Sequence, residues 1–153
     1  MKINNLKQRP HLTKNTKTEK TYLQFEKLLS ELRKRELPAE IVNSVNKDIE
    51  EINSIPGDGN PLKKTIGKKQ NGIIKLIEKK IKLVPKKHYL NLWLPLGMAV
   101  FGIPIGIIFG ISMGNMAFLG VGLPVGMVLG IAIGTELDKK AFEEGRQLDL
   151  EVN

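Results

Sequence analysis

Residues 91–135 read NLWLPLGMAVFGIPIGIIFGISMGNMAFLGVGLPVGMVLGIAIGT, a stretch without a single Asp, Glu, Lys, Arg or His. A hydrocarbon core about 30 Å thick is crossed by roughly 20 apolar residues of helix, so the stretch is about twice as long as one crossing. As one straight helix it would be roughly 68 Å long, which exceeds the thickness of any bilayer. The stretch therefore predicts two membrane-spanning helices joined as a hairpin.

The expected turn lies near the middle of this stretch. Gly114, Asn115 and Met116 occur there, and Asn beside Gly is typical of a tight turn. The sequence therefore predicts one transmembrane helix at about residues 92–113 and a second at about residues 117–134.

Glycine recurs at every fourth position in both predicted helices. Residues four apart lie on one helix face, so each series forms a ridge without side chains, where another backbone can approach closely. The two ridges can hold each other within one hairpin, or at least one of them can pack against another copy of the chain. Gly97 lies outside the series, so we expect it to tolerate a larger residue. The predicted helix-packing residues are Gly102, Gly106, Gly110, Gly114, Gly122, Gly126, Gly130 and Gly134.

The two predicted helices also repeat one pattern. Residues 102–114 match residues 122–134 at their glycines, at one proline and at one isoleucine, which indicates an internal duplication. Pro104 and Pro124 are the matching prolines. Each removes one backbone hydrogen bond, so we expect a helix kink at both.

Two runs in this region carry a resemblance to a known group of proteins. They are WLPLGMAVFGIPIG at 93–106 and GNMAFLGVGLPVGMVLGIAIGTELDKKAFEEGRQLDL at 114–150. These runs resemble small bacterial glycine-zipper membrane proteins, a mostly uncharacterised family. The resemblance implies a membrane hairpin and self-association, and it brings no established activity to transfer.

Length and composition set limits on the rest of the chain. A chain of 153 residues leaves room for one small domain beside the hairpin. It contains no cysteine, which excludes disulfides and thiolate chemistry. Residues 1–20 are rich in Lys and lack an apolar core, so we expect no signal peptide and expect the hairpin itself to direct membrane insertion.

The formal net charge of +8 is unevenly distributed. Basic residues are in excess at 1–20 and 61–87, both on the N-terminal side of the hairpin, and the positive-inside rule places that side in the cytoplasm. A two-helix hairpin returns to the side it left, so residues 136–153 are expected to form an acidic cytoplasmic tail, helical to about residue 147. We therefore expect a multi-pass protein of a bacterial cytoplasmic (inner) membrane with both termini in the cytoplasm.

The part before the membrane reads as a small helical domain. Residues 1–17 lack periodicity and are expected to form a disordered basic N-terminus. Residues 18–61 are expected to form a cytoplasmic helical pair and loop. The first helix, at about 18–36, opens with Thr21 and Gln24 at capping-box spacing. The second helix carries an apolar stripe of Ile41, Val45, Ile49, Ile52 and Ile55.

Residues 62–87 predict a basic amphipathic juxtamembrane helix with an isoleucine stripe. Such a helix can lie in the headgroup plane, where each Lys near an anionic surface contributes on the order of 1 kcal/mol. Alternatively, it packs as a third bundle helix with a solvated basic face. We expect the first arrangement. The predicted membrane-surface residues are Lys63, Lys64, Lys68, Lys69, Lys75, Lys79, Lys80, Lys82, Lys86 and Lys87.

Aromatic rings mark the place where the chain enters the apolar stretch. Tyr89 and Trp93 are predicted interface anchors, because amphipathic rings prefer the headgroup level. His88 is expected to be interfacial for the same reason, rather than catalytic.

Sets of residues that carry chemistry are missing. His11 and His88 are far apart in sequence, and no Cys or carboxylate cluster joins them. The glycines at 120, 122 and 126 lie inside an apolar helix, without the preceding strand that a dinucleotide-binding loop requires. We therefore expect no enzyme activity, no metal and no cofactor. Nucleic acid is a disfavoured partner, because the basic segments lack aromatic residues that could stack on bases.

The composition and the hairpin favour a structural role. We expect an all-α membrane protein in which a two-helix transmembrane glycine-zipper hairpin follows a small basic cytoplasmic helical domain. It would act as an integral membrane scaffold or anchor that self-associates and presents the basic domain at the cytoplasmic surface. The expected partners are anionic headgroups of the bilayer, further copies of the chain and a cytoplasmic protein. The alternative is a pore-forming or membrane-disrupting effector, assembled as a ring of hairpins.

Overall fold

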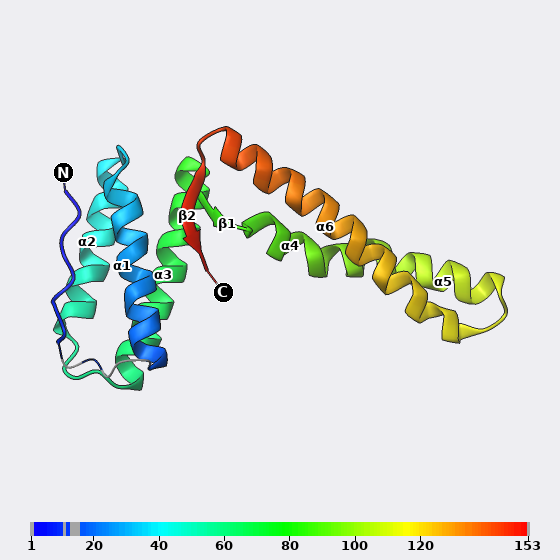
Figure 1. The fold of residues 1–153 in the computed structure, drawn as a ribbon, viewed down its shortest axis with the longest axis horizontal. Coiled ribbons are helices and arrows are strands. Elements are labelled where there is room, and N and C mark those ends of the chain that lie inside the picture. Colours follow the sequence, from blue (N-terminus) through cyan, green and yellow to red (C-terminus); the bar gives the residue numbers. More distant parts are fainter. Residues whose placement is uncertain (1, 11, 13–15, 153) are drawn as a thin grey trace. The chain divides into compact units, whose positions relative to one another are not determined.

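Contacts divide the chain into two compact units in the computed structural model, which describes residues 2–10, 12 and 16–152 (Figure 1). The first, which we call the helical unit, comprises Met1–Pro85 and Leu148–Asn153. The second, the hairpin unit, comprises Lys86–Gln147. The chain is mostly helical, as the sequence predicts.

Three helices build the helical unit: α1 (Lys17–Arg33), α2 (Ala39–Ser54) and α3 (Asn60–Ile81). Helix α1 begins within one residue of the predicted start at about residue 18, but its cap is not the predicted one. Thr16 is its N-cap, and its side chain accepts a hydrogen bond from the Glu19 N–H at 3.2 Å. Thr21, the expected cap, lies inside the helix and donates to the Lys17 carbonyl instead.

The apolar stripes of all three helices meet in one core. Phe25 and Leu29 of α1, Ile49 of α2 and Ile66 and Ile77 of α3 are fully buried in the same cluster. The isoleucine stripe of α3 is therefore covered by protein. The expectation that this helix lies on the membrane with its stripe in lipid is wrong, because α1 and α2 offer that stripe an apolar partner within the chain.

The described part of the N-terminal segment is held against α2, contrary to the expected disorder of residues 1–17. Asn46 and Asn53 lie two turns apart on the same face of α2 and bind the backbone of this segment. Their side-chain oxygens accept hydrogen bonds from the Asn4 N–H and the Lys7 N–H, each at 2.8 Å. Ile3 is buried against the core. Side-chain amides thus replace the partner strand that an extended segment normally needs. Residues 1, 11 and 13–15 lie outside the described part of the chain.

Two short strands were not expected from the sequence. β1 (Val84–Lys86) and β2 (Gln147–Glu151) pair in a two-stranded sheet. The helix that was expected to reach about residue 147 ends at Glu143 instead, and Gln147 begins β2. Leu148 and Leu150 alternate with exposed residues and are buried in the core of the helical unit, which is the pattern of a strand that covers an apolar surface.

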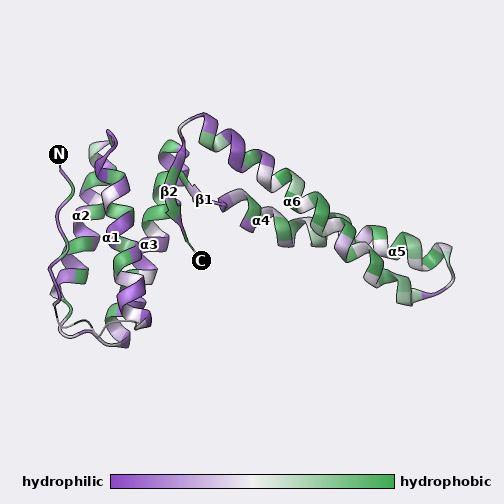
Figure 2. Cartoon of the chain, in the orientation of Figure 1, coloured by the Kyte–Doolittle hydropathy of each residue, from purple (hydrophilic) through white to green (hydrophobic). Residues whose placement is uncertain are grey.

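The hairpin unit contains two long apolar helical segments, His88–Ser112 and Met116–Glu143, each long and apolar enough to cross a membrane. The first consists of α4 (His88–Gly97), the π-helix η1 (Met98–Gly102) and α5 (Ile103–Ser112). The second consists of the 3-10 turn η2 (Met116–Phe118) and α6 (Leu119–Glu143). Hydrophobic residues predominate along α5 and the adjoining part of α6 (Figure 2).

Helix α6 ends at Glu143 through a backbone motif. The Gly145 N–H donates to Phe142 O at 3.0 Å, and the Arg146 N–H donates to Ala141 O at 2.8 Å. Gly145 has φ +68°, a left-handed conformation that glycine adopts without a steric penalty. This stop turns the chain out of the helix before β2.

Candidate functional site: a glycine-lined contact between two apolar helices

Burial in the hairpin unit is inverted relative to a water-soluble core. Large side chains point outward: Ile108 is 63% exposed, Ile111 68% and Val128 65%. In the most apolar stretch of His88–Ser112 only 22% of the residues are buried, and in that of Met116–Glu143 only 17% are. Apart from Ala141, the described residues that are buried here are all glycines: Gly97, Gly102, Gly106, Gly110, Gly122, Gly126, Gly130 and Gly134.

These glycines face the backbone of the opposite helix. A β-carbon added to Gly126 would lie 2.5 Å from the Gly102 nitrogen, and one added to Gly134 would lie 2.6 Å from the Leu90 Cα. Real β-carbons do not approach backbone atoms this closely, so a side chain here must push the helices apart. The same holds for Gly106, Gly122 and Gly130, which meet the backbones of Leu119, Gly106 and Trp93 respectively.

Gly97 belongs to this contact, contrary to the expectation that it would tolerate a larger residue. A β-carbon on Gly97 would lie 2.5 Å from the Gly126 oxygen and 2.6 Å from the Gly130 Cα. The cause is the π-helix η1, in which the Ile103 N–H bonds to the Met98 oxygen five residues back. One wider turn adds a residue to the repeat, so the glycine face continues from position 102 to position 97 rather than 98.

One of the predicted packing residues lies at the turn instead, and a second packs against the start of the returning segment. Gly114 has φ +63° and open space around its Cα, so it serves the chain reversal rather than helix packing. Gly110 faces the side chain of Met116, whose sulfur lies 3.0 Å from the position of a β-carbon. Asn115 is the N-cap of the short helical turn Met116–Phe118, and its side-chain oxygen accepts a hydrogen bond from the Ala117 N–H at 2.9 Å. The position of the turn agrees with the sequence prediction.

The prolines lie at different points of the two segments. Pro124 is inside α6. Pro104 lies in the first turn of α5, directly after η1, so the helix changes from five-residue to four-residue hydrogen bonds where proline lacks an N–H. Pro95, inside α4, was not singled out from the sequence. The helix kinks themselves stay a prediction.

Asp138 is a site residue that the sequence analysis did not assign. It lies on α6, and its two carboxylate oxygens accept from the Tyr89 N–H at 3.1 Å and the Leu90 N–H at 2.9 Å. These N–H groups belong to the first turn of α4, where no residue of the same helix can accept from them. Asp138 therefore caps α4 from the opposite helix and closes the base of the hairpin. The sequence signal was the absence of a capping side chain at Lys87, the N-cap of α4.

The predicted interface anchors lie beside this base. Tyr89 and Trp93 are half-buried on α4, and the backbones of both face glycines of α6. The rings of His88 and Tyr89 meet edge to face, with 5.0 Å between their centroids. His88 thus takes part in an aromatic contact at the start of α4.

The predicted membrane-surface lysines are divided between the two units. Lys69 links α3 to α2, because its ammonium group lies 2.9 Å from Asp48 and 2.6 Å from Glu51 of α2. The hydrogen bonds that the Lys69 ammonium group donates to Glu51 and Asp48 raise the pKa of Lys69. Lys80 pairs with Glu40 at 3.0 Å. The other predicted membrane-surface lysines of α3 are exposed or partly exposed. Lys82 follows α3, and Lys86 and Lys87 belong to the hairpin unit.

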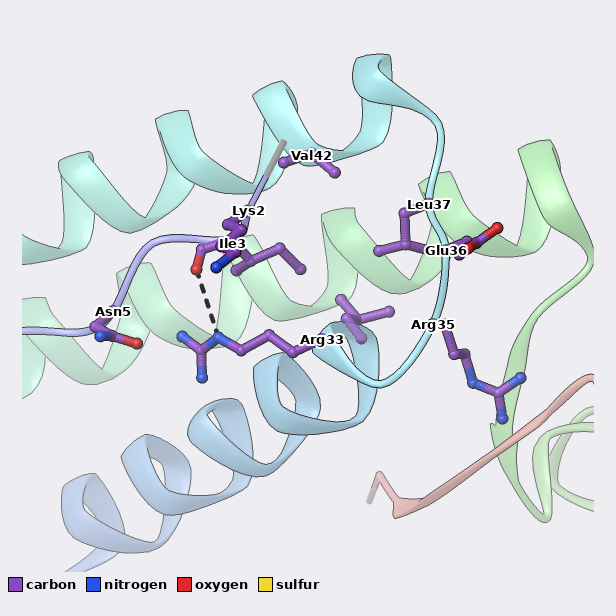
Figure 3. Close-up of a pocket in the computed structure, with 9 residues that line it drawn as sticks. Lys2, Ile3, Asn5, Arg33, Arg35, Glu36, Leu37 and Val42 are labelled. Atoms are coloured by element: carbon purple, nitrogen blue, oxygen red, sulfur yellow. Dashed lines mark hydrogen bonds between the residues drawn. The ribbon is translucent and has the colours of Figure 1, made fainter.

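A pocket of about 580 Å³ lies in the helical unit (Figure 3). The residues Ile3, Leu32 and Val42 form the buried apolar part of its lining. The Arg33 guanidinium also lines the pocket and donates a hydrogen bond to the Ile3 carbonyl. Its full lining is Lys2, Ile3, Asn5, Leu32, Arg33, Arg35, Glu36, Leu37 and Val42. Because Arg33 holds the N-terminal segment, this guanidinium has a structural role.

No cluster of His, Cys, Asp or Glu that could hold a metal ion occurs among residues 2–10, 12 and 16–152. No family model, no curated protein and no solved structure matches the chain significantly. The resemblance to glycine-zipper membrane proteins therefore stays a prediction from sequence.

Proposed function

We propose that the protein is an integral membrane anchor. In this proposal the hairpin unit crosses the bilayer twice as a glycine-zipper hairpin and holds the helical unit at the membrane surface. The observation that carries the proposal is the inverted burial: glycines fill the helix contact, while residues such as Ile108 and Val128 face outward.

Physical chemistry favours lipid as the surroundings of these side chains. A contiguous apolar surface of two long helices is unfavourable in water and marks an interaction site in soluble proteins. In lipid, burying Leu or Ile against protein gains little, so helices associate through close backbone contact between small residues. The arrangement of the hairpin unit fits the second situation. Its backbone is also helical nearly throughout, as the hydrocarbon core demands.

The distribution of charge supports one orientation. Lysines precede α4, and the residues between Asn91 and Thr135 carry no charge. We propose that both ends of the hairpin lie in the cytoplasm and that the turn at Asn115 reaches the far side of a bacterial inner membrane.

Glycine packing is proposed to act within one chain. The faces that could have joined copies are occupied by the opposite helix, as the contacts of Gly97 and Gly126 illustrate. An assembly of copies, including a ring-shaped pore, would need other surfaces of the hairpin. The presented element is then the helical unit, whose basic α3 surface suits an anionic headgroup layer or an acidic cytoplasmic protein.

The experiment is topology mapping with single cysteines, for which the cysteine-free chain needs no prior substitution. Asn115→Cys places a thiol at the turn, and Asn43→Cys places one on an exposed position of α2. In intact bacterial cells a membrane-impermeant maleimide should label only the turn variant. After permeabilisation it should label both, and alkaline carbonate should leave the protein in the membrane fraction. Extraction by carbonate would contradict the membrane anchor, and labelling of Asn43→Cys in intact cells would contradict the orientation.

A further inference from the structure

We propose that a strip of lysines on α3 docks the helical unit on the anionic headgroups of the bilayer. This inference rests on the proposed membrane anchor and names the lipid contact of its helical unit. The strip, which we call the lysine strip, consists of Lys64, Lys68, Lys75 and Lys79. All of these side chains are exposed.

The lysine strip lies on the side of α3 that faces away from the core. An α-helix turns by about 100° per residue, so the strip occupies about 60° of the circumference and is about 22 Å long. Ile66, Ile73 and Ile77, which are buried in the core, lie on the opposite side of the helix. Glu78 is the single acid of α3, and it lies outside this arc. The outermost surface of α3 therefore carries positive charge only.

The ammonium groups of the lysine strip have no ion pair or hydrogen bond within residues 2–10, 12 and 16–152. By contrast, Lys69 and Lys80, on the flank of α3 toward α2, both pair with carboxylates of that helix. The Lys69 hydrogen bond and, at longer range, the charge of Lys68 lower the pKa of Glu51. That carboxylate already binds Lys69 at 2.6 Å. The positive charges of the strip therefore remain available to a partner outside the chain.

Local helix chemistry opposes this arrangement. Lysines four residues apart are neighbours on a helix and repel each other, and the strip contains such a pair at 64/68 and another at 75/79. Gly72 lies between the two pairs along the helix, although glycine weakens a helix interior. A β-carbon there would meet nothing within 4 Å, so packing within the chain does not require glycine. A conflict between local preference and fold of this kind is typical of a functional surface.

The membrane anchor favours lipid as the partner of the strip. Lys79 lies nine residues before His88, where α4 begins, so at most about 30 Å of extended chain separates them. A unit tethered this closely to a bilayer meets its headgroups at high effective concentration, and individually weak contacts then suffice. Lysines near an anionic surface are attracted to it without a defined pocket. Because the isoleucines of α3 are covered by protein, the contact is electrostatic and does not insert the helix into lipid.

The test measures how close the lysine strip comes to the headgroups. Gly72→Cys supplies a single thiol beside the strip, and Asn43→Cys supplies an exposed reference on α2. Each full-length variant carries a bimane label and is reconstituted in vesicles that contain a lipid with a nitroxide on its headgroup. With phosphatidylglycerol present, the label at 72 should be quenched several-fold more strongly than the label at 43. The difference should disappear in phosphatidylcholine alone and in 1 M salt, where the screening length falls to about 3 Å.

A charge-removal variant identifies the lysines responsible. With all four residues of the lysine strip replaced by Gln, the stronger quenching at 72 should be lost. The matched control removes the same charge from exposed positions of α1 and α2 and should keep the stronger quenching. It is Lys17→Gln/Lys20→Gln/Lys27→Gln/Lys47→Gln.

Three results would overturn the lysine strip as a lipid contact. They are equal quenching at 72 and 43 with phosphatidylglycerol present, an equal loss in the matched control, and release of the quenching at 72 by less duplex DNA or polyglutamate, in charge, than the lipid supplies. The last result would assign the strip to nucleic acid or to an acidic protein. Extraction of the protein from the vesicles by alkaline carbonate would show instead that the membrane anchor itself is wrong, and the lipid contact would fall with it.

Discussion

Gly97 of α4 lies directly against Gly126 of α6, so that a β-carbon on Gly97 would be 2.5 Å from the Gly126 carbonyl oxygen. The contact exists because the π-helix η1 adds one residue to the glycine repeat. It shows that the helix-packing face extends past the regular four-residue series, toward the base of the hairpin.

Gly97→Leu should therefore destabilise the hairpin. The side chain must separate two backbones that touch, and overpacking of this kind costs typically 1–3 kcal/mol. The measurement is loss of helicity during a titration from mild detergent into SDS. Gly120→Leu is the matched control, because a β-carbon on Gly120 meets nothing within 4 Å, and it should change the midpoint little. Equal effects of the two substitutions would show that the contact does not hold the hairpin together.

The same substitution also distinguishes packing within one chain from packing between copies. If the glycine faces act within the chain, Gly97→Leu and the unmodified protein should have the same particle mass in mild detergent. A larger unmodified particle that becomes smaller on substitution would show that glycine faces join copies.

Asp138→Ala should weaken the base of the hairpin. The substitution leaves two N–H groups of α4 without their acceptor, and loss of an N-cap costs about 0.5–2 kcal/mol. Asp138→Asn keeps one acceptor oxygen and should cost less. Exposed Glu136→Ala, two residues earlier on α6, should be close to neutral in the same SDS titration. An Asp138→Ala midpoint identical to that of Glu136→Ala would contradict the capping role.

Arg9→Leu should release the N-terminal segment from α2. The guanidinium group donates to the carbonyls of Ile52, Ile55 and Gly57 at 2.6–3.1 Å, at the C-terminal end of that helix. Hydrogen bonds from a charged donor contribute about 1.5–3 kcal/mol, so amide hydrogens of the last turn of α2 should exchange faster with solvent. Asp58→Asn removes only the 3.3 Å ion pair and should have a smaller effect. Unchanged exchange in Arg9→Leu would contradict the ordered N-terminal segment.

Glu31 should make the stability of the helical unit depend on pH. It accepts from Lys34 at 2.5 Å and from the Asp149 N–H of β2 at 3.2 Å, and the Lys34 hydrogen bond is the main cause that lowers its pKa. A pKa below that of the unfolded chain means that the unfolded state binds more protons in the acid range. The contribution is therefore present above about pH 5 and is lost as pH falls through the lowered pKa.

Denaturant titrations at several pH values measure this dependence. Glu31→Gln should be less stable than the unmodified protein near neutral pH, and the difference should shrink in acid. A difference that stays constant between neutral and acid pH would show that the Glu31 carboxylate does not stabilise β2 against α1.

The sequence predicted the two long apolar helices well, because their signals are local. The absence of charge between Asn91 and Thr135 sets the two apolar segments, and Gly114 with Asn115 sets the turn. The regular glycine series identified most of the close contacts. Gly97 was missed because the π-turn that brings it into register has no simple periodicity in sequence.

Features that depend on contacts between distant segments were predicted poorly. The isoleucine stripe of α3 has the same pattern whether it faces lipid or α1, so periodicity could not choose between them. Asp138 became recognisable as a cap only when α4 and α6 lay side by side. The strand pairing of Leu148 and Leu150, and the binding of Asn4 by Asn46, join residues far apart in the chain. Gly145 was a readable stop signal for α6 that the sequence analysis did not use.

In the proposed membrane anchor, the outward-facing apolar side chains of the hairpin meet lipid. Ile108→Cys and Val128→Cys place single thiols at positions 63% and 65% exposed, and Asn43→Cys supplies an exposed position of the helical unit. Spin labels at these sites in reconstituted vesicles can be relaxed by oxygen, which concentrates in lipid, or by a nickel chelate, which stays in water. We expect strong relaxation by oxygen and weak relaxation by nickel at 108 and 128, with the reverse at 43. Strong relaxation by nickel at both 108 and 128 would contradict it.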